Sequence, residues 1–137
     1  MIATVATWCM YCGYMDKWIL PRLARIRGVA VDIVVVSPAG GIANPGPFSP
    51  AYTGSAAPQG NALSLSGMES NLREYLAAYA IAGDGINAYI APELTQAQWQ
   101  VTELPTIAFV DARGRVVRVA AGGMTLGQAE SMVHDAE

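Results

Sequence analysis

The chain of 137 residues has the length of a single domain and can bury a core without metal or disulfide support. Apolar residues make up 53% of it and charged residues 14%, which excludes an intrinsically disordered chain. The net charge of −3 and the lack of a basic stripe argue against a nucleic-acid-binding protein. Two cysteines and one histidine exclude a disulfide-rich scaffold and cannot alone supply a structural zinc site.

The first part of the chain predicts a β-α-β unit. Residues 1–7 are small and β-branched apolar residues, as in a buried strand. Residues 9–27 indicate a helix that ends at Gly28, with a kink expected at Pro21. The apolar positions expected to form its buried face are Tyr11, Met15, Trp18, Ile19, Leu23 and Ile26. Residues 29–36 are nearly all apolar and predict a strand covered on both faces.

Residues 37–66 are rich in Pro, Gly, Ser, Ala and Asn and show no hydrophobic period. An irregular loop of about thirty residues inside a compact domain is uncommon. We therefore interpret this stretch as an insertion after the second strand. It is a functional loop, a disordered segment, or a segment that is partly ordered by packing of Phe48, Tyr52 and Leu63.

The second half of the chain alternates helices and strands and closes with an antiparallel hairpin. Capping-box patterns at Ser66/Glu69 and Thr125/Gln128 open the two longer helices. The other expected elements are a strand over 86–91, a short helix over 92–100, and strands over 106–110 and 116–120 joined by turn residues. The sequence thus predicts one α/β domain over residues 1–137. It has a mixed four- to five-stranded sheet with helices on both faces.

Trp8-Cys9-Met10-Tyr11-Cys12 lies where the first strand meets the first helix. A thiolate at a helix N-terminus faces unpaired backbone N–H groups, which lower its pKa. We expect Cys9 to be partly exposed and nucleophilic, and Cys12 to be more buried and able to resolve a mixed disulfide. The alternatives are half of an intermolecular metal site and two inert core thiols. If the thiols were inert, the exposed apolar rim that Trp8, Met10 and Tyr11 are expected to form around them would have no function.

Trp8-Cys9-x-x-Cys12, followed far downstream by Leu104-Pro105-Thr106, resembles the thioredoxin superfamily, and residues 99–115 look most like its exported TlpA-like branch. The resemblance covers most of the chain except residues 37–66. It implies a thioredoxin fold and a monomeric thiol-disulfide oxidoreductase that needs no organic cofactor or metal. Its partners would be a protein thiol or disulfide substrate and an upstream electron donor or acceptor protein.

The resemblance also implies that the Leu104-Pro105 peptide bond is cis and that Leu104, Pro105 and Thr106 shape the substrate groove. The alternative is an ordinary trans proline at the start of a strand. Related proteins carry a buried acidic residue where this chain has Ala3 or Met15. Asp16 lies four residues after Cys12 on the same helical face, so it could accept the Cys12 proton. Otherwise it is a solvated helix charge.

The insertion leaves its strand at the same sheet edge as the Cys pair, because parallel strands share their carboxyl edge. We expect Phe48 and Tyr52 to cover or extend the substrate groove, the alternative being a mobile spacer. No signal peptide is recognisable, so the protein is either cytosolic or exported and trimmed of its export segment. The TlpA-like pattern favours a periplasmic or extracytoplasmic location. The competing function is a non-catalytic binding or assembly module of the same fold.

Overall fold

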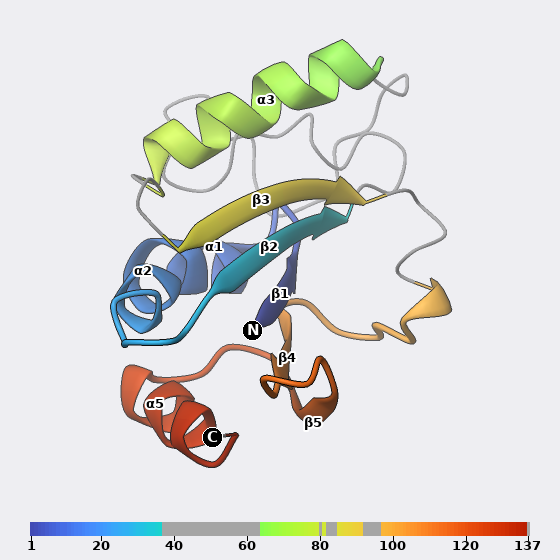
Figure 1. The fold of residues 1–137 in the computed structure, drawn as a ribbon. Helices are drawn as coiled ribbons and strands as arrows, with labels where there is room; N and C mark the ends of the chain where they lie inside the picture. The colour runs from blue at the N-terminus through green and yellow to red at the C-terminus, as the bar shows by residue number, and fades with distance from the viewer. Residues whose placement is uncertain (37–63, 80, 82–84, 92–96, 137) are drawn as a thin grey trace.

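The computed structural model describes residues 1–36, 64–79, 81, 85–91 and 97–136. Its elements are, in chain order, β1 (Ile2–Val5), α1 (Met10–Tyr14), the π-helical segment η1 (Met15–Ile19), α2 (Leu20–Leu23), β2 (Val31–Val36), α3 (Leu65–Ala78), β3 (Ile86–Ala91), β4 (Thr106–Val110), β5 (Val116–Ala121) and α5 (Leu126–His134) (Figure 1). The strands form one sheet in the order β3-β2-β1-β4-β5. The predicted mixed sheet is confirmed and has five strands.

The sheet joins a parallel half to an antiparallel half at β1. β1 and β2 run parallel with Ile2 opposite Asp32, and β2 and β3 run parallel with Asp32 opposite Asn87. β4 lies antiparallel on the other side of β1, where Thr4 is opposite Thr106, and β5 completes the hairpin. The chain therefore leaves β1 at the edge of the sheet where it enters β4. This brings α1 and the residues before β4 together.

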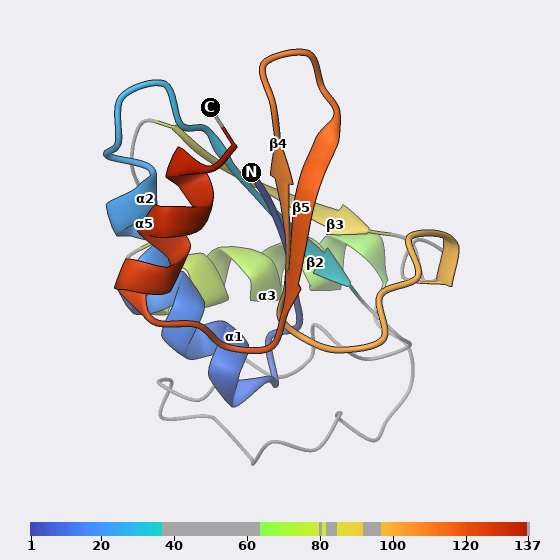
Figure 2. The ribbon, with the colours of Figure 1, turned by 90° about the horizontal axis from the view of Figure 1, so that it is seen from below.

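One face of the sheet builds most of the core. The side chains on this face are almost completely buried. They are Ala3 and Val5 of β1, Val31, Ile33 and Val35 of β2, and Ile107 and Phe109 of β4. Helices α1, α2 and α5 lie on the same side of the sheet (Figure 2), and their buried apolar side chains belong to the same core cluster. On the other face, Tyr89 and Trp99 are half exposed and line a pocket with Val34. The expectation that the second strand is covered on both faces is confirmed, because Val34 and Val36 are buried as well.

The first helical segment differs from the uniform helix expected over residues 9–27. It passes through a π-helical turn in which the Leu20 N–H bonds to the Met15 carbonyl. This turn directly precedes Pro21, which has no N–H to donate. The helix ends at Leu23, before the predicted end. Two residues expected on its buried face are instead exposed, Tyr11 by 69% and Trp18 by 48%. The face that is buried consists of Cys12, Met15, Asp16, Ile19, Leu20 and Leu23.

Helix α3 begins earlier than its predicted cap. The Oγ atom of Ser64 accepts the Gly67 N–H at 3.2 Å, so the predicted capping box of Ser66 and Glu69 is wrong. Ser66 already lies in the first turn, where its backbone is helical. The last two residues of the expected insertion, Leu65 and Ser66, thus belong to α3, and Ser64 is its N-cap. The rest of the insertion, with Phe48 and Tyr52, lies outside the described residues.

The end of the chain follows the prediction closely. The capping box of α5 is confirmed, because the Gln128 N–H bonds to Thr125 Oγ1 at 3.3 Å and the Thr125 N–H bonds to Gln128 Oε1 at 2.8 Å. Of the short helix expected over 92–100, residues 97–98 are helical and 92–96 lie outside the described residues. In the part of the chain that the structure describes, no helix combines the length and the apolar character that crossing a bilayer requires.

Candidate redox site

Cys9 occupies the turn that connects β1 to α1. Its N–H bonds to the Ala6 carbonyl at 3.1 Å, and its carbonyl accepts the Gly13 N–H at 3.0 Å, which starts the helix. Cys9 has extended backbone angles and is the N-cap of α1. Its sulfur accepts the Cys12 N–H at 3.2 Å, as the oxygen of a serine or aspartate does at other helix starts. The sulfur therefore faces the positive end of the helix dipole.

The two cysteines are free thiols in very different environments. Both thiols are buried: Cys9 is only 7% exposed, less than expected, and Cys12 is fully buried. The hydrogen bond from the Cys12 side chain lowers the pKa of Cys9 to about 7, with help from the backbone N–H groups of Cys12 and Tyr11 and against the effect of burial. Burial raises the pKa of Cys12 far above its usual range, and the hydrogen bond and charge of Cys9 add to this. At neutral pH Cys9 is therefore the stronger nucleophile.

The segment before β4 lies against Cys9. The Cys9 thiol donates to the carbonyl oxygen of Leu104 at 3.7 Å, across 95 residues of sequence. The peptide bond between Leu104 and Pro105 is cis. The Pro105 carbonyl accepts the Gly122 N–H at 2.8 Å, and Thr106 Oγ1 donates to the Glu103 carbonyl at 2.6 Å. These bonds hold the Leu104-Pro105-Thr106 segment next to the nucleophilic sulfur.

The surface around the Cys pair is apolar and aromatic. Met10 is 56% exposed and Tyr11 69% exposed, whereas Trp8 is partly buried against the core. The Tyr11 ring packs on the backbone of Gly123, where an added Cβ would lie 3.2 Å from its Cδ1 atom. The predicted rim residues are thus grouped around the start of α1. Gly123, which follows β5, is a contact of this rim that the sequence did not single out.

Asp16 is fully buried, so the alternative of a solvated helix charge is wrong. The Tyr75 hydroxyl donates a hydrogen bond to its Oδ2 atom. Its Oδ1 atom is buried and has no hydrogen-bond partner among the described residues. Burial raises the pKa of Asp16 to about 7; the Tyr75 hydrogen bond opposes this shift, and the charge of Cys9 adds to it.

Tyr75 is the residue of this cluster that sequence reasoning missed. It belongs to the apolar face of α3, and nothing in the local pattern distinguishes it from a core residue. The signal lies in chemistry: a buried tyrosine hydroxyl usually has a hydrogen-bond partner, and Asp16 sits on the buried face of the first helix. Pairing the two requires knowing how α3 packs.

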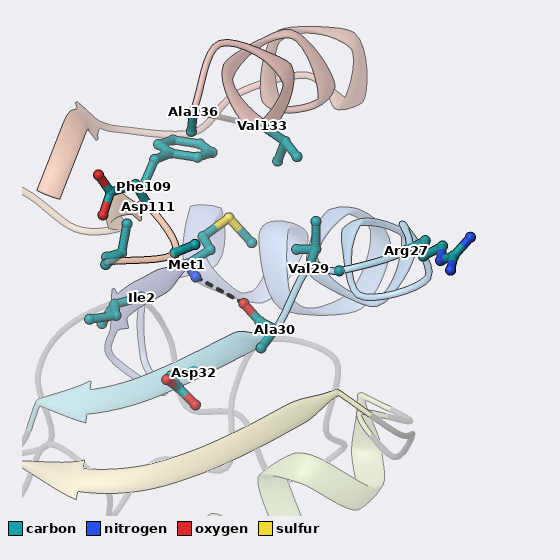
Figure 3. A pocket seen from close by; sticks show the side chains of 13 residues that line it. Met1, Ile2, Arg27, Val29, Ala30, Asp32, Phe109, Asp111, Val133 and Ala136 are labelled. Atoms are coloured by element: carbon teal, nitrogen blue, oxygen red, sulfur yellow. Dashed lines mark hydrogen bonds between the residues drawn. The ribbon is translucent and has the colours of Figure 1, made fainter. Parts of the chain in front are cut away.

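A cavity in the described part of the structure lies away from the cysteines. It has a volume of about 500 Å³ and lies between the start of β1, the segment before β2 and the end of α5 (Figure 3). Val29, Phe109 and Val133 line it, together with the carboxyl group of Asp111. Among the described residues, no three His, Cys, Asp or Glu side chains gather closely enough to hold a metal ion.

Three solved structures resemble the chain over 98% of its length. One, from Chlorobium tepidum, is assigned as a thiol:disulfide interchange protein DsbE; it has a TM-score of 0.63 and 16% identity, and 77% of its chain is covered. Another is the exposed lipoprotein thioredoxin Etrx1 of Streptococcus pneumoniae TIGR4, with a TM-score of 0.59, 16% identity and 82% of its chain covered.

A third is a thioredoxin-like protein from Aeropyrum pernix, with a TM-score of 0.63, 18% identity and 76% of its chain covered. No protein-family profile and no curated protein matches the sequence. At these identities the likeness establishes the fold. The predicted thioredoxin fold is confirmed.

Proposed function

We propose that this chain of thioredoxin fold is a thiol-disulfide oxidoreductase that reduces or exchanges protein disulfides through Cys9 and Cys12. The observation that carries the proposal is the position of the Cys9 sulfur. It caps a helix and lies 3.7 Å from the Leu104 carbonyl oxygen, and its pKa is lowered to about 7, chiefly by the hydrogen bond from the Cys12 side chain. A thiolate available near neutral pH beside an accessible backbone segment is suited to attack a disulfide in another polypeptide.

Reduction proceeds in two steps. The Cys9 thiolate attacks one sulfur of a substrate disulfide and forms a mixed disulfide, while the other substrate sulfur leaves with the electron pair of the broken bond and takes up a proton. Cys12 then loses its proton and attacks the Cys9 sulfur. This forms the Cys9–Cys12 disulfide and releases the second substrate thiol. Two electrons pass from the dithiol to the substrate, and the reverse sequence oxidises a substrate dithiol.

Asp16 accepts the proton of Cys12 during the second step. Its carboxyl group is buried in the same core, and its pKa of about 7 lets it gain and lose a proton near neutral pH. The negative charges of Cys9 and Asp16 both oppose ionisation of Cys12. An internal acceptor is needed because Cys12 is fully buried and bulk water cannot take its proton directly.

The substrate is a polypeptide that lies along Leu104, Pro105 and Thr106 and contacts the apolar rim of Met10 and Tyr11. The two rim side chains are more than half exposed, and such exposed apolar patches are typical of protein contact sites. The redox couple itself carries the electrons, so the reaction needs no organic cofactor. An upstream protein that donates or accepts electrons returns Cys9 and Cys12 to the redox state they had before the reaction. The extracytoplasmic location fits the exposed lipoprotein among the structural neighbours.

Insulin, whose disulfides are reducible, provides the test. The wild-type protein should accelerate insulin reduction by dithiothreitol, and Cys12→Ser should accumulate a mixed disulfide with insulin that intact-mass analysis detects. Cys9→Ser is the matched control and should form no adduct. If the wild-type protein does not accelerate insulin reduction and Cys12→Ser forms no adduct, the proposal is contradicted. That outcome would indicate a non-catalytic binding or assembly module.

A further inference from the structure

Helix α3 contributes one polar atom to the interior next to the Cys pair. Tyr75 is fully buried, and its hydroxyl donates a hydrogen bond to Asp16 Oδ2. Its ring is stacked on Tyr79 with the ring centroids 4.2 Å apart and the planes 30° from parallel. The stacking fixes the ring, so the hydroxyl has a defined position relative to the carboxylate.

The Asp16 carboxylate is bonded at one oxygen only. Tyr75 occupies Oδ2, while Oδ1 is buried and has no partner among the described residues. A buried polar atom without a partner is unfavourable for folding, and such atoms are often associated with function. The groups that interact with Asp16 are the thiols of Cys9 and Cys12 at the start of the first helix and the hydroxyl of Tyr75 on α3.

We propose that Tyr75 is a positioning residue for thiol-disulfide exchange, whose hydroxyl holds the Asp16 carboxylate so that Oδ1 is left to take the Cys12 proton. This inference rests on the proposed function and deepens it. In the resolving step the Cys12 S–H proton passes to Oδ1, and the Cys12 electron pair forms the bond to the Cys9 sulfur. The electron pair of the mixed disulfide leaves with the substrate sulfur, which takes up a proton.

The hydroxyl also determines how much of Asp16 is ionised. A hydrogen bond donated to a carboxylate stabilises the ionised form, so its loss favours the protonated form. A protonated Asp16 cannot accept a proton from Cys12. Without the Tyr75 hydroxyl, the resolving step should therefore need a higher pH, whereas the attack by Cys9 should be little affected.

A single-turnover reaction of the reduced protein with 5,5′-dithiobis(2-nitrobenzoate) separates the two steps. The first nitrothiobenzoate released reports attack by Cys9, and the second reports resolution by Cys12. Tyr75→Phe removes only the hydroxyl and keeps the stacked ring. We expect it to move the pH midpoint of the second release upward by about one unit and to slow that release about fivefold at pH 7. The first release should stay within about twofold of the wild-type rate, which also shows that the variant is folded.

Two further variants make the test specific. Tyr14→Phe changes an exposed hydroxyl on α1 and should leave both releases unchanged. Asp16→Asn should slow the second release, and adding Tyr75→Phe to it should have no further effect on the pH profile. An unchanged second release in Tyr75→Phe would overturn this inference alone. Absence of the first release in the wild-type protein would instead overturn the proposed function.

Discussion

Replacing Asp16 by asparagine should make the folded protein more stable than the wild-type protein, by an amount that increases as the pH rises. The pKa of this buried carboxyl is raised from 3.8 to about 7. Because the folded state binds the proton more tightly, the free energy of unfolding of the wild-type protein falls as the pH increases from 4 to 7. The shift corresponds to about 4 kcal/mol in total, of which about 3 kcal/mol accrues between pH 4 and pH 6.5. Asparagine does not titrate and keeps an oxygen for the Tyr75 hydroxyl.

The measurement is urea unfolding of both proteins at several pH values between 4 and 6.5, followed by tryptophan fluorescence in the presence of a reductant. This window avoids the titration of Cys9, whose pKa is lowered from 9.0 to about 7. A lowered pKa has the opposite effect, because it adds stability as the pH rises from 7 to 9. The stability difference between Asp16→Asn and the wild-type protein should grow steadily across the window.

Asp111→Asn is the control, because Asp111 is partly exposed and hydrogen bonds donated by Arg115 lower its pKa. Its effect on stability should stay constant between pH 5 and pH 6.5, since this carboxyl is ionised there in both the folded and the unfolded state. A pH-independent difference for Asp16→Asn as well would refute the reasoning, because it would mean that Asp16 is as solvated as an ordinary surface carboxylate.

Two other outcomes follow from the structure. Ser64→Ala should lower the free energy of unfolding by about 1 kcal/mol through loss of the α3 cap, while Ser66→Ala should change it by less than about half of that; equal effects in urea unfolding would contradict the assignment of Ser64 as the cap. Alkylation of Cys9 by iodoacetamide should show a midpoint near pH 7 that moves toward 9 in Cys12→Ala, because the largest cause of the lowered pKa is the hydrogen bond from Cys12. A midpoint that stays near 7 would assign the shift to the helix start alone.

The local signals in the sequence predicted most of the sheet. The strands over 86–91 and 106–110 have their predicted bounds, because alternating or continuous apolar residues between turn residues leave few other conformations. The first helix was harder to predict, since Tyr11 and Trp18 have apolar character but lie on its exposed side. Helical periodicity identifies a stripe of apolar residues, but aromatic residues at a contact surface have the same spacing as residues of a core.

The sequence by itself determined where the two thiols lie, because a Cys-x-x-Cys pair at a strand-to-helix junction places Cys9 at the helix start and Cys12 in the interior. These relations are local, and backbone geometry within a few residues fixes them. The approach of Leu104 to Cys9 and the bond from Tyr75 to Asp16 span 95 and 59 residues of sequence. The packing of α3 and the pairing of β4 with β1 decide these contacts, because only the folded core brings such distant residues together. Asp16 is the one charged residue on the side of the first helix that faces the core. Only the tertiary structure decided that its carboxyl group is buried.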